Sequence, residues 1–315
     1  MKILKTYDSR NHFIIASPRS GTTWISKMLN AHLEVNCVER RLFGNYADFV
    51  LDEGNNTPRH RVTLDKYVNS LMLHHGMPQS NTDDVMQSLI VGITKEERRI
   101  SKKKIIVDKI TPYLSTSQHV INQINKFFPK SKIIYLVRDG RDVLTSGVFH
   151  WFNKKPLNVE LTDFEIKRRN AFINSETLKL ERFFQDKEIE QWATEWIEPL
   201  QTIKKAKNTH KVKIVSYESL LNNTKGVLTD CLLFLAASTK PTIIDNCIET
   251  GSFKTMSNGR VSGQAKADAH IRKGVSGDWK NYFTYKDGQL FNEIAGEALV
   301  EFGYEENSNW FERLR

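Results

Sequence analysis

The chain has 315 residues, which is long enough for one large α/β domain with a sizeable hydrophobic core. Hydrophobic residues make up 39% of it and charged residues 26%, a composition that excludes a disordered, collagen-like or low-complexity chain. With 46 basic and 37 acidic residues the formal net charge is +9, which indicates a surface that attracts nucleic acid, acidic membrane or small polyanions.

The cysteines and the apolar runs of the sequence indicate where in the cell the protein is expected. Cys37, Cys231 and Cys247 lie far apart and form no CxxC pair, so neither a disulfide framework nor a zinc site is expected. The first apolar run, residues 13–16, is too short for a signal sequence. Residues 231–237 form the longest later run, far below the roughly 18 to 20 residues that cross a bilayer. We therefore expect a soluble, cytoplasmic protein without a transmembrane segment.

The first predicted unit is a strand, a turn and a helix. A β-rich run at 12–16 precedes the turn SPRSG at 17–21, and apolar residues at helical spacing continue from 22 to 33. Weaker periodicity at 36–103 predicts helices joined by loops. Between 95 and 104, six basic residues face two acidic ones, and no aromatic residues interleave, so we expect a solvated positive face there.

The same strand, turn and helix pattern recurs further along. Strands are expected at 105–107 and 132–137, with a helix opening at Thr111-Pro112 after the first and the turn RDGRD after the second. A fourth strand is expected at 211–215. This repetition predicts a three-layer α/β sandwich with a central parallel sheet, whose ligands bind beyond the carboxyl ends of the strands.

Helices fill most of the remaining chain. Long helices are expected at 160–205, where Trp192, Trp196 and Leu200 recur at helical spacing and are more typical of core than of a cofactor site. A mostly buried helix is expected at 227–236. From Phe253 to residue 277 the chain is rich in Gly, Ser, Lys and Arg, which predicts a mobile basic loop.

The loop SPRSGTTW at 17–24 is predicted to bind an anion. It joins a buried strand to a helix N-terminus, offers free N–H groups and a cation, and contains Gly21, which lets the backbone close around an anion. The Walker spacing GxxxxGK[ST] is absent, so no lysine and Mg²⁺ ligand pair for ATP hydrolysis is present, and no metal is expected.

This octapeptide resembles the 5′-phosphosulfate loop of the PAPS-dependent sulfotransferases. The segment YLVRDGRDV at 135–143 is similar to their 3′-phosphate motif, with Arg138 and Ser146 at the family's eight-residue spacing. IRKGVSGDWKN at 271–281 resembles their C-terminal RKGxxGDWKN signature. The resemblance spans roughly residues 12–285 and implies a P-loop-kinase-like fold in a single sulfotransferase domain over residues 1–315. It also implies that 36–103 and 150–185 build the acceptor pocket.

The resemblance implies 3′-phosphoadenosine 5′-phosphosulfate (PAPS) as donor and PAP as product. Weaker matches, VSYESL at 215–220 and SFKTM at 252–256, correspond to segments that contact the adenine. A doubly charged 3′-phosphate needs cations, and adenine needs apolar faces such as aromatic rings. The implied cofactor-binding residues are Arg19, Ser20, Gly21, Thr22, Thr23, Trp24, Arg138, Ser146, Tyr217, Ser252, Phe253, Met256, Arg272, Lys273 and Gly274.

Sulfuryl transfer needs a cation at the leaving oxygen and a base at the acceptor hydroxyl. Arg19 stands where the cytosolic members have lysine, and we assign it to the leaving oxygen, with Lys109 as a helper. The histidine that serves as base in the aryl and steroid enzymes is absent from the stretch IVDKITPY. Asp108-Lys109 is similar to the Glu-Lys pair of carbohydrate-sulfating and bacterial members, so Asp108 is the predicted base. A salt-bridge or turn-cap aspartate is the alternative, and His74, His75 and His150 are reserves.

Two departures limit the resemblance. Gly251 replaces a threonine that usually precedes the Ser-Phe pair. Residues 280–289 match the family's dimer motif only loosely, with Tyr285 and Gln289 in place of its valine and glutamate, so a homodimer is left open.

The predicted reaction is sulfation of an alcohol, phenol or carbohydrate hydroxyl, with no nucleic-acid partner. The residues Trp151, Phe152, Lys154 and Lys155 slightly favour a sugar-like or acidic acceptor. A nucleotide-dependent small-molecule kinase, a basic nucleic-acid-binding protein and a catalytically silent nucleotide-binding homologue are the alternatives.

Overall fold

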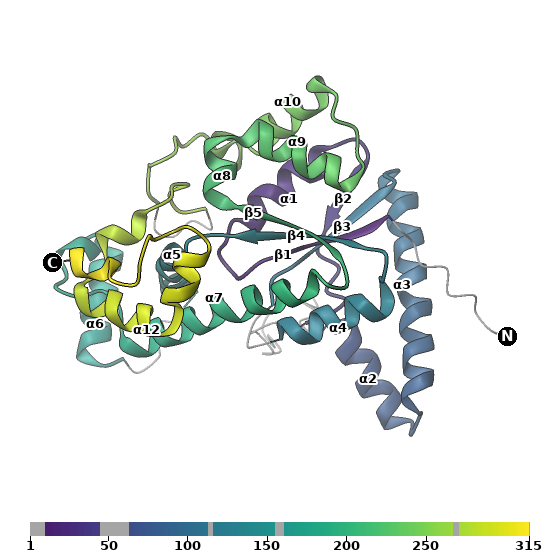
Figure 1. The fold of residues 1–315 in the computed structure, drawn as a ribbon, viewed down its shortest axis with the longest axis horizontal. Helices are drawn as coiled ribbons and strands as arrows, with labels where there is room; N and C mark the ends of the chain where they lie inside the picture. The colour runs from purple at the N-terminus through teal and green to yellow at the C-terminus, as the bar shows by residue number, and fades with distance from the viewer. Residues whose placement is uncertain (1–9, 45–62, 113–115, 155–160, 267–270, 315) are drawn as a thin grey trace. The chain divides into compact units, whose positions relative to one another are not determined.

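The computed structural model describes residues 10–44, 63–112, 116–154, 161–266 and 271–314. It contains two compact units (Figure 1). The first comprises Met1–Val137 and Glu198–Gly251, and the second comprises Arg138–Ile197 and Ser252–Arg315. Each unit combines an earlier and a later segment, and the single domain over residues 1–315 stays a prediction.

A parallel sheet forms the centre of the first unit. Its strand order is β2-β3-β1-β4-β5, and every neighbouring pair is parallel, as the sequence predicted. The strands are β1 Asn11–Ile15, β2 Val35–Val38, β3 Ile105–Ile110, β4 Lys132–Val137 and β5 Lys211–Ser216. Strand β2 is a correction, because the region from residue 36 onward was expected to hold only helices and loops. It has only four residues, which leaves almost no alternation to detect.

Helices cover both faces of this sheet. Figure 1 shows α1 (Thr22–Ala31), α8 (Tyr217–Asn222), α9 (Thr224–Leu235) and α10 (Pro241–Thr250) on one face. On the other face lie α4 (Ser117–Phe127) and the last turns of α7 (Asp186–Ala206). Two further helices, α2 (Leu64–His74) and α3 (Gln79–Ser101), pack against each other. The predicted three-layer arrangement is therefore confirmed.

Alternation along the strands decides which helix layer each side chain meets. Ile14, Val107 and Ile134 join the core beneath α1, α9 and α10. Phe13 points to the other face, where its ring meets that of Phe128 at 5.1 Å. In the register of β1 and β3, Phe13 pairs with Asp108 and Ile14 with Lys109. Because successive side chains of a strand alternate, Asp108 and Lys109 lie on opposite faces of the sheet.

The described part of the second unit is helical. Its elements are α5 (Gly140–Lys154), α6 (Asp163–Ile173), η1 (Thr177–Lys179), the first turns of α7, α11 (Phe253–Met256), η2 (Asp278–Asn281), α12 (Tyr285–Glu301) and η3 (Trp310–Arg313). Trp192 and Trp196 are buried, which confirms that they belong to the core, as does Leu200 in the first unit. The Nε1–H group of Trp196 donates to the carbonyl of Arg138 at 2.9 Å, and this bond fixes the backbone at the start of the predicted 3′-phosphate motif.

Candidate active site

The 5′ loop leads directly from β1 into α1. Gly21 is the N-cap of α1, with φ at +91°, and Arg19 also has a positive φ of 67°. A Cβ atom at Gly21 would lie 2.6 Å from the ring of Tyr217, so no side chain fits there. The first turn of α1 contains no acidic residue. The positive end of the helix dipole therefore remains available to an anion.

Ser20 is the residue of this loop whose hydroxyl group best suits an oxyanion. Its hydroxyl oxygen is buried, and within the described part of the chain it has no hydrogen-bond partner. Buried hydroxyl groups are normally hydrogen-bonded, so an unpaired one beside a helix N-terminus fits a loop built to receive an oxyanion. Thr22 is buried in the same turn, and Thr23 and Trp24 are half-buried. The Trp24 and Tyr217 rings meet edge to face at 5.6 Å.

Two charged residues meet on the α1 face of the sheet. Lys109 Nζ lies 2.9 Å from Glu39 Oε2, and the side chain of Glu39 is 35% exposed. Glu39 directly follows β2 and Lys109 is near the end of β3, so both lie toward the carboxyl edge of the sheet, where the 5′ loop also begins. Glu39 was not among the predicted site residues because strand β2 was not predicted. A charged residue directly after a short β-rich run is the signal that would have found it.

Asp108 lies on the opposite face and is fully buried, with 0% exposure. One carboxylate oxygen accepts from the backbone N–H of Arg40 at 3.0 Å, and the other accepts from Arg40 Nε at 3.1 Å. Burial raises the pKa of Asp108, while the charge and hydrogen bonds of Arg40 oppose that rise. These contacts match the alternative reading of Asp108 as a salt-bridge residue, and its role as base stays a prediction.

Arg40 organises a polar cluster around Asp108 that sequence analysis did not foresee. Its Nη1 atom lies 3.2 Å from both Asn11 Oδ1 and Thr94 Oγ1, and 3.7 Å from a carboxylate oxygen of Glu97. The Arg40 side chain is only 2% exposed. Burial also raises the pKa of Glu97. A single buried guanidinium thus compensates two carboxylates, which makes it a strong determinant of local stability.

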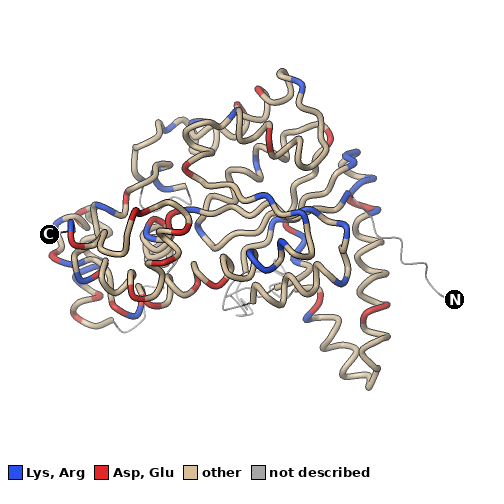
Figure 2. The backbone as a smooth tube through the Cα atoms, viewed as in Figure 1, with Lys and Arg blue, Asp and Glu red and all other residues tan. Residues whose placement is uncertain are grey.

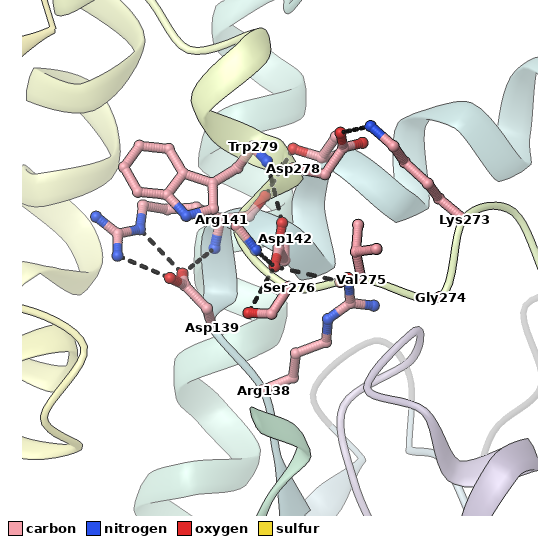
Figure 3. A network of polar contacts seen from close by, with 12 residues as sticks. Arg138, Asp139, Arg141, Asp142, Lys273, Gly274, Val275, Ser276, Asp278 and Trp279 are labelled. Atoms are coloured by element: carbon pink, nitrogen blue, oxygen red, sulfur yellow. Dashed lines mark hydrogen bonds and ion pairs between the residues drawn. The ribbon is translucent and has the colours of Figure 1, made fainter. Parts of the chain in front are cut away.

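In the second unit the structure brings two of the predicted motifs together (Figure 3). Arg138 Nη2 donates to the carbonyl of Val275 at 3.1 Å, and the same atom lies 3.6 Å from Asp142. Asp142 accepts from the backbone N–H groups of Gly277 at 2.7 Å and Trp279 at 3.0 Å. The start of α5 therefore holds the C-terminal signature in place, and Arg138 lies beside it.

The two cations of that signature share one carboxylate. Lys273 Nζ lies 2.7 Å from Asp278, and Arg272 also pairs with Asp278. Burial alone would raise the pKa of Asp278, but Arg272 and Lys273 hold it below its usual range. The guanidinium of Arg272 also lies 4.5 Å from the centroid of the Phe149 ring. Its Nε–H group is buried and has no hydrogen-bond partner among the described residues, so Arg272 is fixed in position yet keeps a donor for a ligand.

Phe253 and Gly274 pack against each other in the same unit. Gly274 has φ at +68°, and a Cβ atom there would lie 2.3 Å from the Phe253 ring. Ser252 caps α11, accepting from the backbone N–H of Thr255 and donating to its hydroxyl at 2.8 Å. This cap orients the ring of Phe253, the first residue of α11. Met256 ends α11 and is half-buried. Ser146 is half-buried on α5.

The threonine missing at position 251 has a packing explanation. Gly251 is buried in the first unit, where an added Cβ atom would lie 2.2 Å from Cγ of Met28. A threonine here would require the Met28 side chain to move, so the glycine fits the packing of α1 against the end of α10.

The three histidines that were considered as alternative bases lie on helices α2 and α5 or directly after α2. His74 and His75 are exposed at the end of α2, with ring centroids 5.5 Å apart. His150 is half-buried on α5. Of the residues thought to favour a sugar acceptor, Trp151 is 38% exposed, Phe152 is buried, and Lys155 lies outside the described residues.

Comparison with known proteins identifies the family to which these site residues belong. The model of the sulfotransferase domain matches residues 9–303. The chain belongs to the sulfotransferase family. Sulfotransferase 2A6 of Mus musculus is 28% identical over 210 residues, covering 63% of this chain and 67% of the mouse protein. The 3-beta-hydroxysteroid sulfotransferase of Cavia porcellus is also 28% identical, over 201 residues that cover 61% of this chain and 64% of that enzyme.

A solved sulfotransferase has the same fold. The crystal structure of mouse sulfotransferase SULT7A1 complexed with PAP matches with a TM-score of 0.51 and 16% identity, covering 98% of this chain and 90% of that one. This likeness confirms the predicted fold class. In the described part of this sulfotransferase, no helix is both long and apolar enough to cross a membrane.

Proposed function

We propose that this sulfotransferase transfers the sulfuryl group of PAPS to a hydroxyl group of an alcohol, phenol or carbohydrate and releases PAP. The observation that carries the proposal is the cation cluster of the second unit, where Arg138, Arg272 and Lys273 are held by Asp142 and Asp278. The motif match assigns these three residues to the 3′-phosphate. The PAP complex of the mouse relative and the hydroxysteroid in the name of the Cavia porcellus enzyme support the donor and the acceptor class.

The residues of each unit suit one end of the donor. In the first unit, the N–H groups of the 5′ loop and the unpaired Ser20 hydroxyl would hold the 5′-phosphosulfate. Arg19 would stabilise charge on the leaving oxygen, as a guanidinium can fork to two oxygens without losing its own charge. In the second unit, Phe253 against Gly274 offers an apolar face to adenine. Bound PAPS supplies the activated sulfuryl group.

Two carboxylates of the first unit are candidates for the general base. Asp108 is the candidate from the sequence, but both its oxygens accept from Arg40 and it is shielded from solvent. One observation favours a second candidate, Glu39, whose carboxylate is partly exposed and is positioned by Lys109 at 2.9 Å. A general base must reach the proton that it removes, and Glu39 satisfies that requirement better.

Calorimetric titration with 3′,5′-bisphosphoadenosine and with ATP plus Mg²⁺, at moderate salt and without acceptor, tests the donor site. Micromolar or tighter binding of the bisphosphate with none of ATP is expected. Arg138→Ala should weaken that binding by about 1.5 to 3 kcal/mol, the contribution of a hydrogen bond to a charged group. Lys280→Ala is the control, because Lys280 is an exposed cation of the same signature outside the predicted contact set.

The rival functions give different results in the same titration. A preference for ATP with Mg²⁺ would support the kinase reading. Salt-sensitive retention by DNA or RNA, with no binding of the bisphosphate, would support the nucleic-acid reading. Equal loss of affinity in Lys280→Ala and Arg138→Ala would remove Arg138 from the site.

A further inference from the structure

A basic cleft of about 790 Å³ lies in the first unit, where the strands begin. The amino ends of β1, β3, β4 and β5 contribute to it through His12, Ile105, Lys132 and Lys211. Since all five strands are parallel, this edge is opposite to the one where the 5′ loop follows β1. The cleft is therefore separate from the proposed donor and base residues of this unit.

The charges lining the cleft are strongly unbalanced. Among the described lining residues, Glu34 is the one carboxylate, and it accepts from the backbone N–H of Ser238 at 2.7 Å. Against it stand five cations, which are blue in Figure 2: Arg10, Lys104, Lys130, Lys132 and Lys211. Burial lowers the pKa of Lys132, and the like charge of Lys211 lowers it further. Like charges repel one another, and a bound anion would relieve the repulsion between Lys132 and Lys211.

An unpaired donor lies in the same lining. Ser131 is only 4% exposed, and its buried hydroxyl has no hydrogen-bond partner within the described residues. Its own backbone N–H donates to the carbonyl of Phe128 at 2.9 Å, which fixes the turn before β4. A hydroxyl that is nine-tenths buried costs free energy unless it donates to something, so this one points to an acceptor that enters the cleft.

The apolar residues that line the cleft indicate which kind of anion it binds. Ile105, Pro129, Leu235 and Ala236 supply apolar walls between the charged residues. The volume is in the range of organic ligand sites rather than of a single inorganic ion. A ligand with an anionic head and an apolar body satisfies both features.

We propose that this cleft binds a small organic phosphate or sulfate ester, with its oxyanion on Ser131, Lys132 and Lys211. The site is additional to the donor site and does not depend on the proposed reaction, because it rests on residues of the opposite sheet edge. A phosphate head and a sulfate head present the same acceptor oxygens to these donors, so the chemistry of recognition is shared.

Titration of the full chain with 4-nitrophenyl phosphate, 4-nitrophenyl sulfate and inorganic phosphate tests the cleft. Saturable binding of one or both esters is expected, with inorganic phosphate weaker. Lys211→Glu, at an exposed position, and Ser131→Ala should each lower the affinity about tenfold or more, the loss expected for a charge-assisted hydrogen bond. Lys213→Ala is the matched control, because Lys213 lies on the same strand, pairs with Asp230 at 3.7 Å and does not line the cleft.

Each other outcome overturns the proposal. Unchanged affinity in both variants would place the esters elsewhere, and a loss of affinity in Arg138→Ala alone would place them at the donor residues. Absence of saturable binding at millimolar ester would leave the cleft without this ligand class. Tighter, Lys211-dependent binding of a short oligonucleotide than of either ester would assign the cleft to nucleic acid instead. Far-ultraviolet circular dichroism of each variant separates these outcomes from loss of folding.

Discussion

Replacing Arg40 by alanine should lower the free energy of unfolding by about 3 to 5 kcal/mol, the cost of removing one partner from a buried ion pair. Asp108 would remain fully buried with only the backbone N–H of residue 40 as a partner, and Glu97 would lose the guanidinium that lies 3.7 Å from its carboxylate. Urea unfolding followed by tryptophan fluorescence measures the change. A loss below about 1 kcal/mol would contradict the structural role assigned to this pair.

A double variant distinguishes two causes of the lost stability, the unpaired charge of Asp108 and the loss of packing at residue 40. Arg40→Met combined with Asp108→Leu removes both charges and keeps apolar volume, and such replacements are often neutral or stabilising. We therefore expect the double variant to be more stable than Arg40→Ala. If the two were equally unstable, the contacts of Arg40 with Asn11, Thr94 and Glu97, which both variants lose, would account for the loss instead.

Local sequence was sufficient for the strand, turn and helix units and for the anion loop. Gly21 and its neighbours are contiguous in the chain, and the conformation that they need follows from residue type. The sequence motifs were also sufficient to predict Arg138 and the signature at 271–281 as site residues. They did not predict the hydrogen bond from Arg138 to the carbonyl of Val275. The fold class could therefore be predicted from the sequence.

Contacts between distant segments could not be read this way. Arg40 and Asp108 are 68 positions apart, and neither has a local pattern that specifies the other. Glu39 gains its significance from β2, whose four residues carry too little periodicity to predict. The basic cleft collects residues from the beginnings of four strands, and its lysines look like ordinary surface charges in the sequence.

Glu39 and Asp108 are the two carboxylates that can be compared as the general base. Glu39→Gln keeps the size of the side chain but removes its ability to accept a proton, and Asp108→Asn does the same on the opposite face of the sheet. The partly exposed Glu39 is accessible to an acceptor hydroxyl, whereas both oxygens of Asp108 are engaged by Arg40. We therefore expect Glu39→Gln to lose more turnover than Asp108→Asn.

Glu39→Gln should lower kcat about 10²- to 10⁴-fold, the usual contribution of a general base, while the affinity for 3′,5′-bisphosphoadenosine stays within about twofold of the wild type. The assay uses the member of a phenol, hydroxysteroid and sugar panel that the wild type sulfates fastest. Asp108→Asn should instead lower the urea midpoint and leave most of kcat intact, because its carboxylate compensates Arg40. A large loss of kcat in Asp108→Asn with normal turnover in Glu39→Gln would return the base to Asp108, and normal turnover in both would direct the search to the histidines.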